Sequence, residues 1–533
     1  MELHGLRARL LMHFGCVQTL DGAKIVEHSY PELAQDIGVA LAKLRQWGLT
    51  AGMRVGIYAQ NSYGWLVYDL ALIELGAIPM PFTRDFAGAL NEELFDRHKL
   101  SLLLVSREMA SHIAPHPPYL AFIDAANDRV RARAWDDGRT DDPDTLSLVF
   151  SSGSAGGIKG IIISRKGVEA CIDPIMEAVG LTSSDKFLLF LPMSNFQQRL
   201  LCYAALWYDV SIALIDHTQL YVGMQKCTPT ILVAPPVFFQ MLHGQFRRYP
   251  GWMQRGWRLA GYMLGLLPSA SLRQDLARLL FKSLLGQLGS RVRLLVTGMA
   301  PIKPEIAELF HRLQIPLCET YGLVETGSLT FRDPRSRKFS SVGRPVKGVE
   351  LSFTDEGEVI VRRRNPLSLG YFSCAEGENE KTFVRPGEVA TGDIGVVDAQ
   401  GYLYLKGRKN ELLVASNGYK VHPEALEKQL NACSGVACSV FFQRPDDAHL
   451  SCVVVLEQPD RAECRNAIRR FVDRLEAPKK ISPYVEIIFA PEPFSVENGL
   501  LRPNMKLDRK CIVATYGSKA PPPGLKEAVA QSA

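Results

Sequence analysis

The chain has 533 residues, of which 47% are hydrophobic and 22% are charged, and its net charge is only +5. This length exceeds one ordinary hydrophobic core, so at least two domains are expected, and the composition excludes a disordered chain. The small charge, without a basic run or an aromatic-rich basic patch, argues against a nucleic-acid partner. The eleven cysteines include no Cys-x-x-Cys pair. That pattern argues against zinc or a disulfide framework and favours reduced thiols and a cytoplasmic protein.

Predicted strands and helices alternate through the first four hundred residues. The segment 54–58 is expected to be a buried strand, and 65–75 a helix that Gly76 closes before extended structure resumes at Ile78. Further short apolar strands are expected at 102–105, 187–190, 231–233 and 294–296. One helical face is expected to carry Ile306, Leu309, Phe310 and Leu313. This alternation predicts parallel sheets covered by helices.

Two apolar segments bear on membrane contact. Residues 1–14 are too short and too polar for a signal peptide or a membrane span. The segment 257–267 is apolar but interrupted, which favours a buried helix and leaves open a helix resting on a membrane surface. Membrane association is therefore expected to be peripheral at most.

A charged, turn-forming segment at 407–411 separates two apolar strands and indicates a domain boundary. We expect a large N-terminal domain over 1–409 and a small α+β domain over 410–516. The segment 517–533, with three consecutive prolines, is expected to be a disordered tail.

One loop between two predicted strands, residues 150–160, combines hydroxyls, glycines and a lysine. Such a turn can wrap phosphate oxygens, although a linker with a stray lysine has the same composition. Gly160 follows Lys159 where a Walker loop has Ser or Thr, so a P-loop kinase is disfavoured. The loop instead resembles the phosphate loop of the acyl-adenylate-forming superfamily. This resemblance implies nucleotide contacts from Ser151, Ser152, Gly153, Ser154, Gly156 and Lys159.

Residues 319–326, Glu-Thr-Tyr-Gly-Leu-Val-Glu-Thr, resemble the adenine and magnesium motif of the same superfamily. Tyr321 offers a flat face for adenine, Gly322 allows close approach of the backbone, and Glu325 offers a hard oxygen for Mg²⁺. The resemblance places Glu319 in the nucleotide site and gives the hydroxyl of Thr320 to the α-phosphate. A buried tyrosine beside a surface glutamate would be the structural alternative.

Three later motifs follow in the order of the superfamily. The resemblance assigns Asp393 in Thr-Gly-Asp to the ribose hydroxyls, and Arg408 to the nucleotide. It also makes Asn410 the hinge of a mobile lid, and Gly418 part of the thiol channel. Near the end of the small domain, Lys506 would bridge the substrate carboxylate and the α-phosphate, as in long-chain acyl-CoA synthetases. Taken alone, the triplet reads as a turn and Lys506 as a solvated charge.

The acyl pocket is expected to be lined by Asn195, Phe196, Gly298, Met299 and Ala300, again by resemblance. The chain departs from the family pattern at Ala155, where a hydroxyl is usual, and at Ile158, where proline is usual. Met299 stands where the family often has glycine. It is interpreted either as a side chain that shortens the acyl tunnel or as a methionine that fills a core gap.

The resemblance covers about residues 30–509 and implies an α/β fold with packed, mostly parallel sheets and a small α+β lid. It also implies an ATP- and Mg²⁺-dependent ligase that forms an acyl-adenylate and passes a fatty or related acid to CoA. Two alternatives stay open: an acyl-AMP ligase that loads a phosphopantetheinyl carrier protein, and a weakened, non-catalytic homologue.

Overall fold

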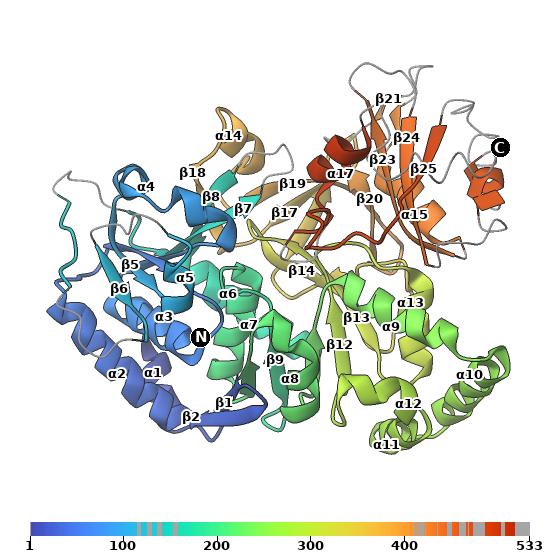
Figure 1. The fold of residues 1–533 in the computed structure, drawn as a ribbon, viewed down its shortest axis with the longest axis horizontal. Helices are drawn as coiled ribbons and strands as arrows, with labels where there is room; N and C mark the ends of the chain where they lie inside the picture. The colour runs from blue at the N-terminus through green and yellow to red at the C-terminus, as the bar shows by residue number, and fades with distance from the viewer. Residues whose placement is uncertain are drawn as a thin grey trace.

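The structure is a computed structural model of the chain. It describes residues 2–113, 119–124, 130–135, 141–152, 158–409, 413–414, 420–421, 423–433, 435–444, 450–457, 465–466, 468–472, 485–502 and 507–517. The described helices and strands form a large N-terminal part and a smaller group of C-terminal elements (Figure 1).

A nine-stranded sheet runs through the N-terminal part. From one edge to the other its strands are β15 (Arg344–Pro345), β14 (Gly327–Phe331), β13 (Leu317–Leu323), β12 (Leu294–Thr297), β11 (Ile231–Val233), β9 (Lys186–Leu189), β10 (Ser211–Leu214), β1 (Cys16–Asp21) and β2 (Lys24–Ser29). The pairs from β13 to β1 are parallel, and the pairs at both edges are antiparallel. The strands expected near 187, 231 and 294 are therefore confirmed, and the structure places them side by side in one sheet.

A second sheet is entirely parallel, with strands β4 (Ile78–Pro81), β3 (Arg54–Tyr58), β5 (Leu100–Val105) and β6 (Leu120–Phe122). All five residues of β3 are buried, as an apolar strand with covered faces requires. The expected helix follows as α3 (Tyr63–Leu75). It begins where the Ser62 side chain accepts a hydrogen bond from the Trp65 amide, and it ends at Gly76, whose φ of 78° is left-handed.

Two further sheets of the N-terminal part are antiparallel. One contains β16 (Glu350–Phe353), β17 (Glu358–Arg362), β19 (Glu388–Val397) and β20 (Leu403–Arg408). The other contains β18 (Ser368–Ser373), β8 (Ile158–Ser164) and β7 (Thr145–Ser152). The α/β class is confirmed, and the parallel expectation holds for the first two sheets only. Alternation of strands with helices predicts parallel sheets, whereas β16 and β17, and β19 and β20, are joined by short turns, and β18 pairs with β8 from a distant part of the chain.

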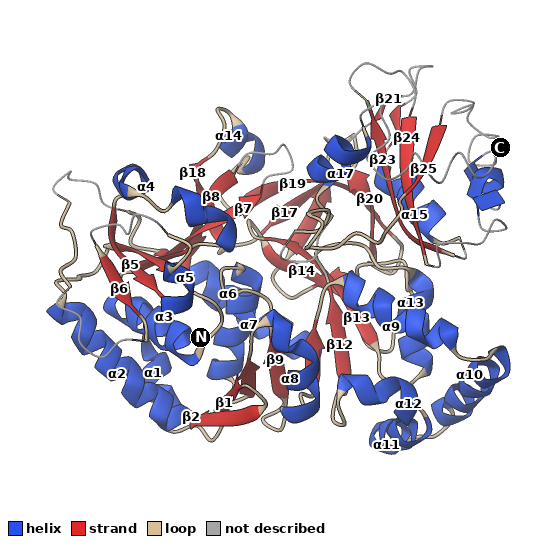
Figure 2. Cartoon of the chain, viewed as in Figure 1, coloured by secondary structure: helices blue, strands red, loops and turns tan. Residues whose placement is uncertain are grey.

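The C-terminal elements combine strands and helices, as expected for a small α+β unit (Figure 2). A three-stranded sheet joins β23 (Val436–Gln443), β24 (Leu450–Leu456) and β25 (Val485–Phe489), and β21 (Leu413–Val414) pairs with β22 (Lys420–Val421). Helices α15 (Pro423–Asn431) and α17 (Arg509–Tyr516) lie here, and residues 465–466 and 468–472 are also helical. The proposed boundary at 409/410 stays a prediction, because residues 410–412 lie outside the described ranges, as do residues 518–533 of the expected tail.

The other described helices lie in the N-terminal part (Figure 2). The α-helices are α1 (Leu6–Leu10), α2 (Tyr30–Gln46), α4 (Glu92–His98), α5 (Arg107–Ala110), α6 (Arg165–Val179), α7 (Phe196–Trp207), α8 (Leu220–Lys226), α9 (Pro236–Arg248), α10 (Gly251–Gly265), α11 (Ala270–Leu280), α12 (Lys282–Leu285), α13 (Pro304–Arg312) and α14 (Glu378–Thr382). Short 3₁₀ helices occupy Leu3–Gly5, Arg84–Ala89, His217–Gln219 and Gly286–Leu288. Helix α13 buries Ile306, Leu309 and Phe310 on one face, as predicted.

Two large hydrophobic clusters hold the N-terminal part together. The first includes the inner faces of α2, α3, α6 and α7, and the second includes residues of α9, α11 and α13 with strands β11 and β12. All ten cysteines among the described residues are free thiols. Within the same part of the chain, every helix is too short or too polar to cross a bilayer.

Candidate active site

The Glu319–Thr326 motif forms the end of β13 and the tight turn into β14. Gly322 pairs with Ser328 there, and a Cβ on Gly322 would lie 2.1 Å from the Gly327 carbonyl oxygen. Gly327 itself has a left-handed φ of 72°. Only glycine allows the two strands to approach so closely, which explains the glycine that the sequence motif contains.

Three residues predicted to bind the nucleotide come together from three strands. The Tyr321 hydroxyl of β13 donates to Asp393 Oδ2 of β19 at 2.6 Å, and Arg408 Nε of β20 lies 2.8 Å from Asp393 Oδ1. Burial, followed by the Asp393 carboxylate, raises the pKa of Tyr321 well above its usual value, so this tyrosine stays a donor at neutral pH. The arrangement fixes a carboxylate beside an aromatic ring and a cation.

A second group joins the phosphate loop to Glu325 through a residue that the sequence analysis missed. Tyr371 of β18 donates its hydroxyl hydrogen to Glu325 Oε1 at 2.8 Å, and its ring centroid lies 5.0 Å from Lys159 Nζ. Lys159 also forms an ion pair with Glu378 of α14 at 2.8 Å. Burial and the Glu325 carboxylate raise the pKa of Tyr371. Tyr371 therefore stays protonated and orients the carboxylate predicted to face Mg²⁺.

Glu319 and Thr297 occupy paired positions on the parallel strands β13 and β12. Glu319 Oε2 and Thr297 Oγ1 are both buried and have no hydrogen-bond partner among the described residues. Burial raises the pKa of Glu319 to about 7, although the Arg332 charge opposes that shift. Buried polar atoms are nearly always hydrogen-bonded in proteins, so these two oxygens are candidates for a ligand that brings donors.

The predicted acyl-pocket wall begins at Gly298, where β12 ends, and β12 pairs with β13, the strand that carries the nucleotide motif. A Cβ on Gly298 would lie 2.9 Å from the Thr320 carbonyl oxygen, so glycine is needed for this contact. Thr320 Oγ1 donates to the Thr330 carbonyl at 2.9 Å and lies 2.7 Å from Ser328 Oγ. The residue after Gly298 is Met299, which has a left-handed φ of 71° and packs against the second hydrophobic cluster. That conformation explains why glycine suits this position.

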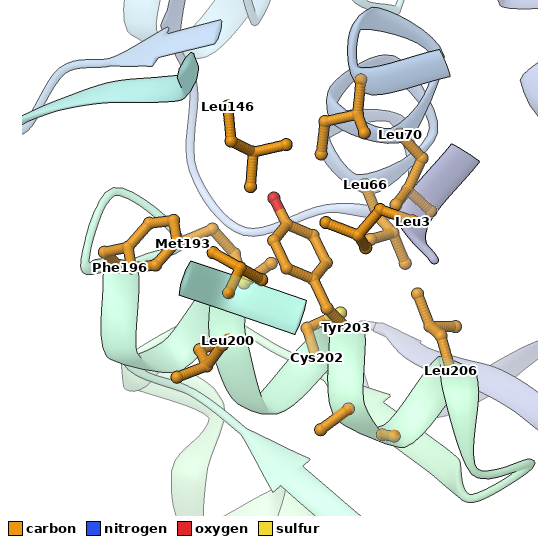
Figure 3. Close-up of a cluster of buried hydrophobic side chains, with 14 of the residues drawn as sticks. Leu3, Leu66, Leu70, Leu146, Met193, Phe196, Leu200, Cys202, Tyr203 and Leu206 are labelled. Atoms are coloured by element: carbon orange, nitrogen blue, oxygen red, sulfur yellow. The ribbon is translucent and has the colours of Figure 1, made fainter. Parts of the chain in front are cut away.

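The other predicted pocket residues lie elsewhere in the fold. Asn195 caps α7, where its side chain accepts from the Gln197 amide at 3.0 Å. Phe196 is almost fully buried in the first cluster, near Met193, Leu200 and Tyr203 (Figure 3). Ala300 lies exposed in the loop that follows Met299. Phe196 and Met299 thus pack in different clusters, and their common role in an acyl pocket stays a prediction.

Several predicted site residues lie outside the described residues. They are Gly153, Ser154 and Gly156 of the phosphate loop, the hinge residue Asn410, Gly418 and Lys506. Ser151 and Ser152 end β7 and pair with Lys159 and Ile158 of β8, so the strands on either side of residues 153–157 are antiparallel. The functions assigned to all these residues stay predictions.

The chain is similar to known proteins over most of its length. The sequence profile described as "AMP-binding enzyme" matches residues 17–372, about two thirds of the chain. The chain belongs to the AMP-binding enzyme family. Among its relatives, the long-chain-fatty-acid–CoA ligase FadD15 of Mycobacterium tuberculosis is 27% identical over 75% of this chain and 72% of the relative. The 2-succinylbenzoate–CoA ligase of Enterococcus faecalis is 26% identical over 63% of this chain and 64% of the relative.

Two solved structures have the same fold. The o-succinylbenzoate CoA synthetase MenE of Bacillus subtilis, in complex with its acyl-adenylate, has a TM-score of 0.70 and 18% identity, and the match covers 96% of this chain and 97% of MenE. ATP-bound MatB of Rhodopseudomonas palustris has a TM-score of 0.70 and 20% identity over 97% and 99% of the two chains. Because both matches extend beyond residue 372, they include the C-terminal elements.

Proposed function

We propose that this AMP-binding enzyme is an AMP-forming acid–thiol ligase, and specifically a fatty acid–CoA ligase. The observation that carries the proposal is the convergence of Tyr321, Asp393 and Arg408, together with the Lys159–Tyr371–Glu325 group, which shares the 319–326 motif with Tyr321. A fatty acid is favoured because FadD15 and the fatty acyl-CoA synthetase A of Dictyostelium discoideum are among the relatives. The succinylbenzoate ligases make an aryl acid the main competitor.

The proposed nucleotide site uses groups of opposite character. Asp393 can accept from both ribose hydroxyls in place of the Tyr321 hydroxyl, and Arg408 lies beside it as a cation. The unpartnered oxygen of Glu319 can accept from an exocyclic amine of the base. Lys159, at the end of the phosphate loop, brings a positive charge held between Glu378 and the Tyr371 ring.

The donor set fits Mg²⁺ bound together with ATP. Glu325 supplies one oriented carboxylate, and no group of three or more His, Cys, Asp or Glu suited to a metal occurs among the residues that the structure describes. Mg²⁺ is commonly held by one or two carboxylates together with substrate phosphates, which is the set available here. When bound, Mg²⁺ would neutralise phosphate charge, with Glu325 as its protein ligand.

The chemistry proceeds in two transfers. A carboxylate oxygen of the acid attacks the α-phosphorus of ATP, and the bond to the β-phosphate oxygen breaks to give an acyl-adenylate and pyrophosphate. Lys506 would stabilise the charge that develops on the α-phosphate. The sulfur of CoA then attacks the acyl carbon, the bond to AMP breaks, and the thiol proton leaves to solvent. Rotation of the small domain about Asn410 would exchange Lys506 for the thiol channel at Gly418.

The test is AMP formation by the full chain with ATP, Mg²⁺ and short, medium, long and aryl acids, with and without CoA. We expect turnover that depends on CoA and yields a fatty acyl-CoA identified by mass. Asp393→Asn should weaken ATP use strongly, whereas the surface variant Asp355→Asn should not. A single burst of adenylate unaffected by CoA would instead assign a carrier-protein acceptor. Absence of adenylate with every acid would refute catalysis and support the non-catalytic homologue.

A further inference from the structure

Helices α10 and α11 are neighbours at the outer end of the N-terminal part (Figure 1). Eight large apolar side chains on these helices, or directly after α10, are exposed to solvent. We call them the apolar face, and their exposed fractions lie between 47% and 72%. Its members are Trp252, Leu259, Tyr262, Met263, Leu266, Leu272, Leu279 and Leu280. Such a concentration on a folded chain marks an interaction surface.

The outward position of this face is set by firm packing of the inner side of α10. A Cβ on Gly261 would lie 2.3 Å from the Arg312 carbonyl oxygen, and Gln314 Nε2 donates to the Gly261 carbonyl at 3.0 Å. Trp257 makes edge-on ring contacts with Tyr249 and Phe281 at centroid distances of 4.8 and 6.4 Å. The helix is thus anchored on one side.

The exposed side of α10 has its own helical period. Trp252, Leu259, Met263 and Leu266 follow at spacings of seven, four and three residues, which places them on one stripe of the helix surface. The sequence analysis favoured a buried helix here. The helix is confirmed, but it is apolar on both sides, and the fold covers only the inner one.

Positive charge is concentrated in the same segment of the chain as the apolar face. The segment 247–293 contains nine Arg and Lys residues and a single acidic residue, Asp275. Among the described residues, five of the basic side chains are exposed and have no ion-pair partner: Arg248, Arg255, Arg258, Lys282 and Arg291. Apolar side chains interleaved with unpaired arginines are complementary to a surface that offers both hydrocarbon and negative charge.

We propose that α10 and α11 bind the enzyme to the surface of a bilayer that contains anionic lipids. The apolar face enters the boundary between headgroups and acyl chains, and the arginines contact lipid phosphates. Trp252 and Tyr262 are side chain types that favour this depth. With 15 residues, α10 lies in the interface and does not span the membrane. The proposal does not depend on which acid the enzyme activates.

The first test is co-sedimentation of the full chain with vesicles of phosphatidylcholine alone and of phosphatidylcholine with phosphatidylglycerol. We expect binding to the mixed vesicles that weakens as salt rises, because exposed charges are screened. Brominated lipid should quench part of the tryptophan fluorescence, and Trp252→Phe should remove that part. Equal binding to both vesicle types, or no binding, would overturn the proposal.

Matched variants locate the contact. R255Q/R258Q should bind the mixed vesicles about 25-fold more weakly, at about fivefold per charge. R335Q/R337Q, which changes two exposed arginines elsewhere, should bind like the unmodified chain. L259S/M263S/L266S should lose binding, whereas L11S/M12S/F14S, which changes three exposed apolar residues at another site, should retain it. Unchanged binding by both α10 variants would refute this surface.

Another occupant would give a different pattern. If the apolar face joined two copies of the chain, light scattering would show a dimer that L259S/M263S/L266S converts to a monomer, without vesicle binding by the unmodified chain. Melting temperature and acyl-adenylate formation from a soluble acid should be the same in all variants. If a serine variant failed to fold, two measurements would still test the proposed membrane contact. They are vesicle binding by R255Q/R258Q and quenching of Trp252 fluorescence by brominated lipid in the unmodified chain.

Discussion

Removing the hydroxyl of Tyr371 should impair use of ATP and Mg²⁺ while leaving the fold intact. Tyr371→Phe keeps the ring that lies 5.0 Å from Lys159 Nζ and deletes only the donor that bonds Glu325 at 2.8 Å. A hydrogen bond to a charged group contributes about 1.5–3 kcal/mol, so kcat/KM for ATP should fall about 10- to 150-fold. Because the carboxylate loses its orientation, we expect weaker Mg²⁺ binding, measured as a higher Mg²⁺ concentration at half-maximal rate.

The assay is pyrophosphate exchange driven by a saturating acid, with ATP and Mg²⁺ varied independently. Tyr63→Phe is the control, because the Tyr63 hydroxyl also donates to a carboxylate, Asp36 Oδ2, at 2.7 Å on an exposed surface. That variant should behave like the unmodified enzyme. If Tyr371→Phe retained full kcat/KM at every Mg²⁺ concentration, Tyr371 would have no part in positioning Glu325. If it became faster, the bond would be one that ATP binding must break.

Three further predictions concern pH, acid length and stability. Folding raises the pKa of Glu319 from 4.5 to about 7, so the stabilisation that its neutral form provides is complete below pH 4.5 and is lost as pH rises through 7. The neutral variant Glu319→Gln should therefore gain stability relative to the unmodified chain between pH 5 and 8. Thermal melts at several pH values should show a gain of up to about 3 kcal/mol. Met299→Gly should move the optimum of the acid panel to longer chains, with about fourfold in kcat/KM per added methylene; an unchanged optimum in a folded variant would mean that Met299 only fills the core. Arg199 contacts Asp69 at 2.6 Å, and both side chains are fully buried. Arg199→Met should lower the free energy of unfolding in urea by about 3–5 kcal/mol, because Asp69 stays buried without its cation. If the further change Asp69→Leu restored the stability, the unpaired charge would be identified as the cause.

Much of the architecture could be predicted from local patterns. The buried strand 54–58, the helix closed by Gly76 and the apolar strands near 187, 231 and 294 have compositions that permit few alternatives, and the structure confirms them. The ordered motifs predicted the family, which the profile match to residues 17–372 confirms. The antiparallel sheets were missed, since strand direction depends on pairing between distant segments.

Individual contacts were beyond prediction for the same reason. Tyr371 lies 46 residues after Glu325, and nothing in its neighbourhood marks it as a partner. The strained backbone of Met299 became visible only as a φ of 71°, although the unusual residue at a glycine position was a usable signal. The exposed side of α10 could not be told from a buried one, because an apolar stripe has the same sequence in either environment.

The contact between Gly298 and Thr320 restricts how this enzyme could evolve or be engineered toward new acids. Any side chain at position 298 would strike the backbone of the strand that carries Thr320. With the roles proposed for the two residues, substitution at position 298 would damage ATP recognition before it changed acid selectivity. New specificity must therefore arise at neighbouring positions such as Met299, which already tolerates a side chain. The contact between Gly298 and the Thr320 backbone therefore couples changes in acid specificity to the retention of ATP use.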